Sequence, residues 1–183
     1  MVDVAPCPDD VVPSAGISHR FVQLTDLHLS DVSGSGASAA LEWAVRFVND
    51  TAPDFLAVSG DVTTYGTRRS AECFVEALER IRVPVLFTPG NAELRDPGAL
   101  LCLAPLVRPE KRVYLDRGLL VLLPDTSTGM LPDSERDLMT CAVRAHPGGT
   151  RRIVITHYPM DRLASDSRAW LDAWIQDSAT ELL

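Results

Sequence analysis

The sequence predicts an α/β fold with a largely parallel sheet and flanking helices. Short apolar runs, typical of buried strands, alternate with longer segments in which apolar residues recur at helical spacing. Strand, helix and strand in this order favour right-handed crossovers, which place successive strands parallel. The chain has 183 residues, of which 46% are hydrophobic, so it is long enough to bury the core of one domain.

The first half of the domain is expected to contain three strands separated by two helices. The strands are the apolar runs at 21–25, 55–59 and 83–88, and each is bounded by turn-forming or polar residues. The helices, at 39–49 and 68–81, carry apolar residues at helical spacing. This part of the chain therefore predicts two successive parallel crossovers.

The second half of the domain is expected to contain further strands and helices, including one β-hairpin. Two further strands are expected to be joined across a turn at residues 116–118, which ends in glycine. A helix, a strand and a last helix come next. The expected segments are irregular structure at 97–109, strands at 112–114 and 119–123, a helix at 134–145, a strand at 152–156 and a helix at 167–177.

The chain is expected to divide into a flexible leader, residues 1–19, and a domain, residues 20–183. The leader carries three prolines among acidic and small residues. It lacks the basic and apolar regions of a signal peptide, and no apolar run approaches the roughly 20 residues of a membrane span. The four cysteines form no C-x-x-C pair and are expected to be buried thiols in a reducing compartment. A cytoplasmic location is therefore expected.

The charge balance disfavours one class of partner. The formal net charge is −8, and the basic residues form no block of the kind that tracks a phosphate backbone. We expect no nucleic-acid patch and no membrane contact.

Candidate metal ligands follow four of the expected strands. Asp26 and His28 come after the first strand, Asp61 after the second, Asn91 after the third, and His157 after the strand at 152–156. Carboxylate, amide and imidazole groups are all metal ligands. Because the carboxyl ends of parallel strands meet at one edge of a sheet, these residues are expected to converge there.

The local spacing adds to this expectation. Asp26 and His28 lie two residues apart, so in extended backbone they point to the same side, while Leu27 points back to the core. Gly60 and Gly90 directly precede their candidate ligands, and glycine permits the positive φ that a sharp bend requires.

Each candidate taken alone also fits an ordinary role. An aspartate can cap a helix, a histidine can lie on the surface, and Gly-Asp or Gly-Asn can be simple turn chemistry. The combination carries more weight, because two of only four histidines follow expected strands. We assign no role to the other two, His19 and His146.

The ordered motifs resemble those of the calcineurin-like metallophosphoesterase family. The segments FVQLTDLHLS, PDFLAVSGDVTTYG, VPVLFTPGNAE, GLLVLLPDTSTG and RRIVITHYP are similar to family segments, and together they span residues 21–159. The resemblance implies the layered metallophosphoesterase fold. The short domain looks most like the bacterial cyclic-nucleotide phosphodiesterase branch of that family.

The resemblance also implies a site for two divalent metal ions, namely manganese, iron or zinc. Asp26 and His28 would bind the first metal, Asp61 would bridge both, and Asn91 and His157 would bind the second. The implied reaction is hydrolysis of a small phosphate ester, most typically a phosphodiester, by a metal-activated water. Substrate choice would come from the loops at 30–38 and 124–134.

The chain departs from the family pattern at two places. The third motif reads Gly90-Asn91-Ala92-Glu93, where the family has histidine in place of Ala92, so no catalytic residue is assigned. The family's final Gly-His-x-His motif has no counterpart after His157, and the fold is therefore expected to be incomplete at its C-terminus. Such a fold would leave a sheet edge uncovered and open to self-association.

Three functions remain open from the sequence. The chain is expected to be a metal-dependent phosphoesterase with weak or no activity, because general acid help is typically worth roughly 10²–10⁴-fold. The alternative is a non-catalytic domain that binds metal or a partner. An ordinary α/β domain with coincidental ligands is the least favoured interpretation.

Overall fold

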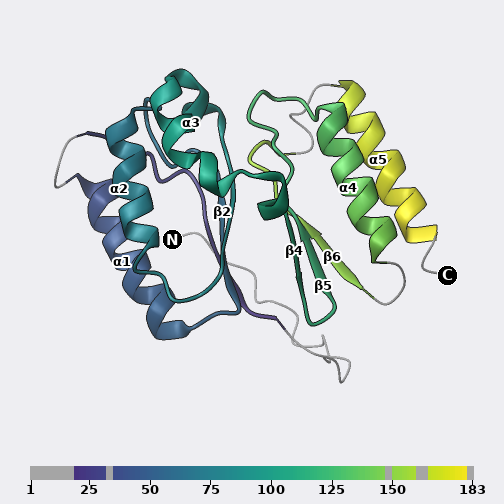
Figure 1. Ribbon diagram of the computed structural model, residues 1–183, viewed down its shortest axis with the longest axis horizontal. Helices are drawn as coiled ribbons and strands as arrows, with labels where there is room; N and C mark the ends of the chain where they lie inside the picture. The colour runs from purple at the N-terminus through teal and green to yellow at the C-terminus, as the bar shows by residue number, and fades with distance from the viewer. Residues whose placement is uncertain (1–18, 32–34, 147–149, 160–164, 181–183) are drawn as a thin grey trace, which may run out of the picture.

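The computed structural model describes residues 19–31, 35–146, 150–159 and 165–180, with the side chains of 174–180 left out. The described chain forms four layers, helices on sheet on sheet on helices (Figure 1). Of the expected leader, residues 1–18 lie outside the described part. None of the helices in the described ranges has the length and apolar character needed to cross a membrane.

The first sheet is parallel and has the strand order β1-β2-β3. Two of the helices that cover its outer face are its crossovers. The elements of this half are β1 (Phe21–Leu24), α1 (Gly36–Thr51), β2 (Phe55–Ser59), α2 (Arg68–Leu78), β3 (Val85–Thr88) and α3 (Pro97–Leu103). The expected strands and helices are thus present, and α1 begins earlier than its apolar stripe because the Ser35 side chain accepts the N–H of Ser38 as an N-cap.

The second sheet has the order β4-β5-β6, with one antiparallel and one parallel pair. Its elements are β4 (Val113–Asp116), β5 (Leu119–Leu122), α4 (Asp133–Ala145), β6 (Arg151–Val154) and α5 (Ser165–Thr180). The β4–β5 hairpin turns through Arg117 at φ 40° and Gly118 at φ 77°. Positive φ at both central residues is the turn geometry that matches the twist of a two-residue hairpin.

The two sheets pack face to face. Apolar side chains from both fill the space between them: Phe55, Ala57, Leu86, Leu119, Val121, Leu123 and Ile155. The α/β fold with parallel strands and flanking helices is confirmed, but the strands lie in two sheets. Every residue of β2 and β5 is buried. Such continuous apolar runs indicate that both faces of a strand are covered, but they do not indicate whether a helix or a second sheet covers each face.

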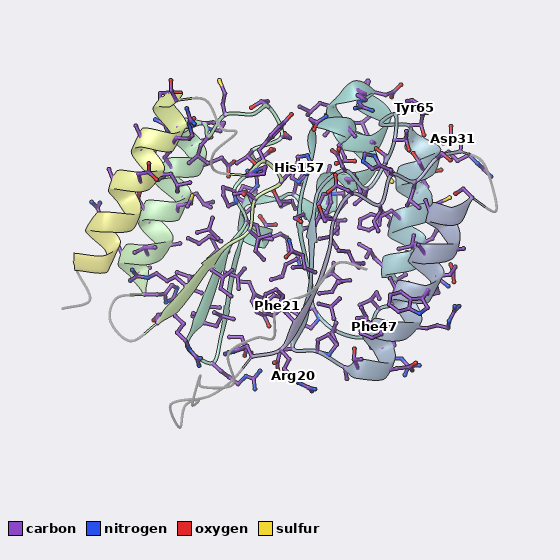
Figure 2. All side chains as sticks on the ribbon, turned by 180° about the vertical axis from the view of Figure 1, so that it is seen from behind. Arg20, Phe21, Asp31, Phe47, Tyr65 and His157 are labelled. Carbon is purple, nitrogen blue, oxygen red and sulfur yellow. The ribbon has the colours of Figure 1, made fainter. Side chains whose placement is uncertain are left out.

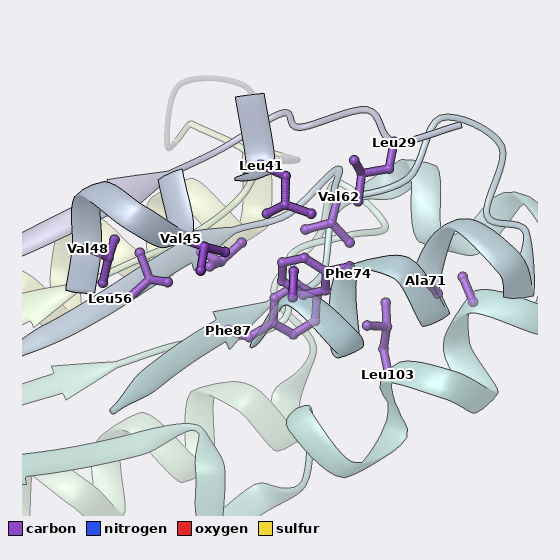
Figure 3. Packing of buried hydrophobic residues seen from close by; sticks show 13 residues of the cluster. Leu29, Leu41, Val45, Val48, Leu56, Val62, Ala71, Phe74, Phe87 and Leu103 are labelled. Carbon is purple, nitrogen blue, oxygen red and sulfur yellow. The ribbon is translucent and has the colours of Figure 1, made fainter. Parts of the chain in front are cut away.

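A second core lies between the first sheet and its helices. Figure 3 shows side chains from α1, α2, α3 and the strands meeting there. Phe74 of α2 contacts Phe87 of β3, with ring centroids 5.8 Å apart. This packing holds the carboxyl ends of β2 and β3 in place.

The expectation of irregular structure at 97–109 is wrong for much of that segment. It contains α3 and two short 3-10 turns, Ala104–Leu106 and Pro109–Lys111. Asp96 caps α3 by accepting the N–H of Gly98 at 2.6 Å, and Pro97 occupies the first helical position. Proline is favourable at that position because its missing N–H would have no helical partner there.

The expected burial of the cysteines is also wrong for the residues described. Cys73 and Cys141 are exposed and Cys102 is half-buried. The buried face of α2 consists of Ser70, Ala71, Phe74 and Ala77, so Cys73 lies beside that face.

The first turns of α5 are anchored to α4 and the second sheet. Leu171 is buried against α4 and the second sheet. The Ser167 hydroxyl accepts the N–H of Leu131 at 3.0 Å, and the Arg136 guanidinium lies over the Trp170 ring.

Candidate metal centre

The five candidate ligands lie at one edge of the molecule, where four parallel-running strands end. Asp26 and His28 follow β1, Asp61 follows β2, and Asn91 begins the 3-10 turn η1 (Asn91–Arg95) after β3. His157 comes from the second sheet, beyond β6, and reaches the space between the two sheets (Figure 2). Strands of both sheets thus bring their candidate ligands to the same edge.

One group of ligand atoms contains Asp26, His28 and Asp61. The Nε2 atom of His28 lies 3.7 Å from Oδ1 of Asp26 and 3.9 Å from Oδ2 of Asp61. One ligand atom from each of the three residues lies within 4.8 Å of the others. Two carboxylates and an imidazole at this spacing fit the donor set of a divalent metal ion.

A second group lies on the other side of Asp61. The Nε2 atom of His157 is 3.4 Å from Oδ1 of Asp61 and 3.2 Å from Oδ1 of Asn91. Asp61 therefore turns one carboxylate oxygen to each group. This is the arrangement that a bridging carboxylate requires, because its charge would be shared by two cations.

The orientation of His157 is set by its other ring nitrogen. Nδ1 lies 3.0 Å from the carbonyl oxygen of Ser59. A carbonyl oxygen only accepts, so Nδ1 carries the proton and, in the neutral ring, the Nε2 lone pair faces Asp61 and Asn91. Metal-binding histidines are commonly held by this kind of contact.

The backbone at three of the candidate ligands is left-handed rather than extended. Asp26, His28 and Asp61 have φ values of 52°, 48° and 50°. The expectation that Asp26 and His28 share a side through extended spacing is therefore wrong, and successive bends bring them together. Left-handed backbone costs a non-glycine residue about 1–2 kcal/mol, and such strain collects at functional sites.

Backbone hydrogen bonds hold these bends. The amide of Asp26 donates to the carbonyl of Gly60 at 3.1 Å, and the amide of His28 donates to the carbonyl of Asp61 at 3.0 Å. The segments after β1 and β2 are thus hydrogen-bonded to each other, which couples the positions of Asp26 and His28 to that of Asp61.

The two glycines before the ligands act for different reasons. Gly60 has φ 81°, as expected for a sharp bend. Gly90 has φ −106°, so the expectation of positive φ is wrong there. A side chain at Gly90 is excluded by space, because its Cβ would lie 2.2 Å from Oδ1 of Asp61 and 2.9 Å from Cε1 of His157.

The residues at the departure from the family motif are both buried. The backbone N–H of Ala92 donates to Oδ1 of Asp61 at 2.8 Å. The Glu93 side chain is fully buried and accepts hydrogen bonds from backbone amides, so it does not replace the missing histidine beside a substrate. Sequence reasoning gave Glu93 no structural role.

The site is buried on one side and open on the other. The side chains of Asp61 and His157 are 8% and 9% exposed, whereas those of Asp26 and His28 are 52% and 45% exposed. A small ligand can therefore approach from the side of Asp26 and His28.

Two packed sheets with carboxylate, imidazole and amide groups at their shared edge define an α/β protein suited to holding divalent metal ions. The chain belongs to the calcineurin-like phosphoesterase family, whose sequence model matches residues 19–177. The family match agrees with the resemblance noted from the motifs.

The fold is also similar to a crystal structure of a dimetal phosphatase from Danio rerio. The two share 14% sequence identity with a TM-score of 0.53, and the match covers 89% of this chain. It covers 66% of the zebrafish chain, slightly under two thirds of its length. No curated protein sequence matches this chain significantly.

Proposed function

We propose that this protein is a metal-dependent hydrolase of phosphate esters, with phosphodiesters as its substrates. The observation that carries the proposal is the position of Asp61, whose two carboxylate oxygens face separate groups of ligand atoms. Family membership supports the same chemistry.

Asp26 and His28 would hold one metal ion, Asn91 and His157 the other, and Asp61 would hold both. Bound metal ions would supply Lewis acidity toward the phosphoryl group and a water of lowered pKa. The chain itself contributes geometry: the Ser59 carbonyl keeps the Nε2 lone pair of His157 toward the site, and the bends at Asp26 and His28 turn both side chains to it.

The chain supplies no side chain at the place where the family has a leaving-group acid. Ala92 cannot donate a proton, and the Glu93 side chain is buried and accepts hydrogen bonds from backbone amides. We infer that the leaving group takes its proton from solvent. We therefore propose that activity is weak, and highest for esters whose leaving groups need no acid.

We also propose a small substrate and a cytoplasmic location. The net charge of −8 disfavours polyanionic partners. Three cysteines in the described ranges are free thiols, which suits a reducing compartment. The segment after β5 would form one wall of the substrate site, because the Thr126 hydroxyl accepts the N–H of Tyr158, next to His157.

The test is hydrolysis of bis-p-nitrophenyl phosphate in the presence of manganese, iron or zinc. We expect slow turnover that EDTA removes and metal restores, and less turnover of the monoester p-nitrophenyl phosphate. Asp61→Asn should abolish it, and Asp116→Asn, far from the site, is the matched control. Turnover that persists in EDTA, or that Asp61→Asn leaves unchanged, would contradict the proposal.

The second candidate is a non-catalytic metal- or partner-binding domain, favoured by Ala92 in the third motif. It predicts metal binding with no turnover of any ester. Calorimetric titration with Mn²⁺ alongside the hydrolysis assay separates the two functions.

A further inference from the structure

Glu93 is the most completely satisfied buried acid near the site. Its side chain is fully buried, two residues beyond Asn91. One carboxylate oxygen, Oε2, accepts the backbone N–H of Asp61 at 2.9 Å and that of Gly90 at 2.8 Å. The other, Oε1, accepts the backbone N–H and the hydroxyl of Thr63, both at 3.0 Å.

These donors come from two separate segments. Asp61 and Thr63 belong to the loop after β2, and Gly90 caps the 3-10 turn that presents Asn91. A single carboxylate therefore joins the loop that carries Asp61 to the turn that carries Asn91. The bond to the Asp61 amide also supports a backbone held at φ 50°, a conformation that persists only where its surroundings enforce it.

We propose that Glu93 is a positioning residue, which sets the place of Asp61 relative to Asn91 and thereby the affinity of the site for metal. The proposal rests on the metal-binding role proposed above. Glu93 itself touches neither metal nor substrate. Residues that hold metal ligands in place typically contribute about 10–100-fold to metal affinity.

The decisive substitution is Glu93→Gln, which keeps the size and removes the charge. Each carboxylate oxygen accepts two hydrogen bonds, and the amide nitrogen of glutamine accepts none. In either orientation of the glutamine side chain, its NH₂ group therefore faces two of the four donors and cannot accept their hydrogen bonds. The matched control is Glu135→Gln, because Glu135 is also a buried acid, bound to Arg112 and to the amide of Asp125 in the other half of the chain.

The experiment uses the full chain and two measurements. Calorimetric titration with Mn²⁺ should show affinity reduced about 10–100-fold in Glu93→Gln and unchanged within about threefold in Glu135→Gln. Amide hydrogen exchange without metal should accelerate at Asp61, Thr63 and Gly90 in Glu93→Gln alone. Equal losses of affinity in both variants would overturn the proposal, since they would reflect general loss of stability.

The exchange measurement separates this proposal from the proposed function. If the unsubstituted chain binds no Mn²⁺, the metal-binding role fails, and with it the claim on affinity. Unaltered exchange at Asp61 and Gly90 in a folded Glu93→Gln variant would overturn the positioning claim whatever the metal result.

A milder pair of variants covers the case in which Glu93→Gln does not fold. Thr63→Val removes, at constant volume, the hydroxyl that donates to Glu93 and accepts the N–H of Gly66, and Thr63→Ser retains both hydrogen bonds. We expect Thr63→Val to weaken Mn²⁺ binding by about 3–10-fold, below the range for a complete loss of such support, with Thr63→Ser close to the unsubstituted chain. Equal affinities for the two variants would contradict the role of Glu93.

Discussion

Asp61 combines three properties that are individually unfavourable for a stable chain. Its backbone is left-handed, its side chain is buried, and its carboxylate lies within 4.8 Å of a ligand atom of Asp26. Left-handed backbone and like charges in proximity both raise the free energy of the folded state. A bound cation would offset the repulsion between the carboxylates of Asp61 and Asp26. This is the physical reason for a buried aspartate at position 61.

Removing the charge of Asp26 tests this reasoning. We expect Asp26→Asn to raise the stability of the metal-free chain by on the order of 1 kcal/mol, because it removes the repulsion between two carboxylates. The same variant should lose most of the stabilisation that Mn²⁺ gives the unsubstituted chain. Thermal unfolding with and without Mn²⁺ measures both effects, and a metal-free variant that is less stable would contradict the first.

The substitution Ala92→His introduces the histidine that the family has at this position. The Ala92 side chain is fully buried beside Asp61, so an imidazole there should cost about 1–3 kcal/mol of stability through overpacking. We expect little gain in hydrolysis of bis-p-nitrophenyl phosphate. A gain of about 100-fold, within the usual range for a general acid, would show that the site has room for the ring.

At the scale of elements, sharp turns at strand ends decide where the ligands lie. Gly60 and Gly118 have similar backbone, with φ of 81° and 77°. A Cβ at Gly118 would meet nothing within 4 Å, whereas one at Gly60 would lie 2.6 Å from the Gly90 nitrogen and 2.7 Å from Nδ1 of His157. The two positions therefore share backbone strain and differ in the space available.

This matched pair gives a quantitative prediction. Gly118→Ala should cost about 1 kcal/mol, from left-handed backbone alone. Gly60→Ala should cost about 3 kcal/mol, from the same strain plus overpacking, and should also weaken Mn²⁺ binding by displacing His157. Chemical unfolding and calorimetry are the measurements, and equal losses of stability would show that the contact around Gly60 relaxes easily.

At the scale of the whole molecule, polar contacts join the two sheet halves at both ends of the strands. His157 reaches across at the metal centre to Ser59 and Asp61. At the opposite end, Arg117 in the β4–β5 turn pairs with Asp54, which precedes β2. The hydrogen bond from the Arg20 amide, together with Arg117, lowers the pKa of Asp54 below its ordinary value of 3.8.

The lowered pKa predicts how the Asp54 contact depends on pH. Because the folded pKa is below the unfolded one, the stabilisation is present above about pH 4 and is lost as pH falls through the folded value. Asp54→Asn should therefore lower the free energy of unfolding by an amount that is constant around neutral pH. This loss of stability should become smaller in acid. Urea unfolding at a series of pH values measures this, and a difference that grows in acid would contradict it.

The sequence by itself determined most of the elements and the identity of the candidate ligands. Apolar runs and helical spacing are local signals, and they placed β2 at its observed bounds and α4 within a residue. Asp61 and His157 were recognisable because chemistry-bearing residues directly follow those runs, and parallel strands end at one edge.

Only the tertiary structure decided how those pieces meet. The division into two sheets depends on contacts between residues such as Phe55 and Tyr114, which are remote in the sequence. The need for glycine at position 90 arises from Asp61 and His157, and the role of Glu93 arises from amides about 30 residues away. Local patterns carry no information about such neighbours, because the energy of these contacts exists only once the chain has brought distant segments together.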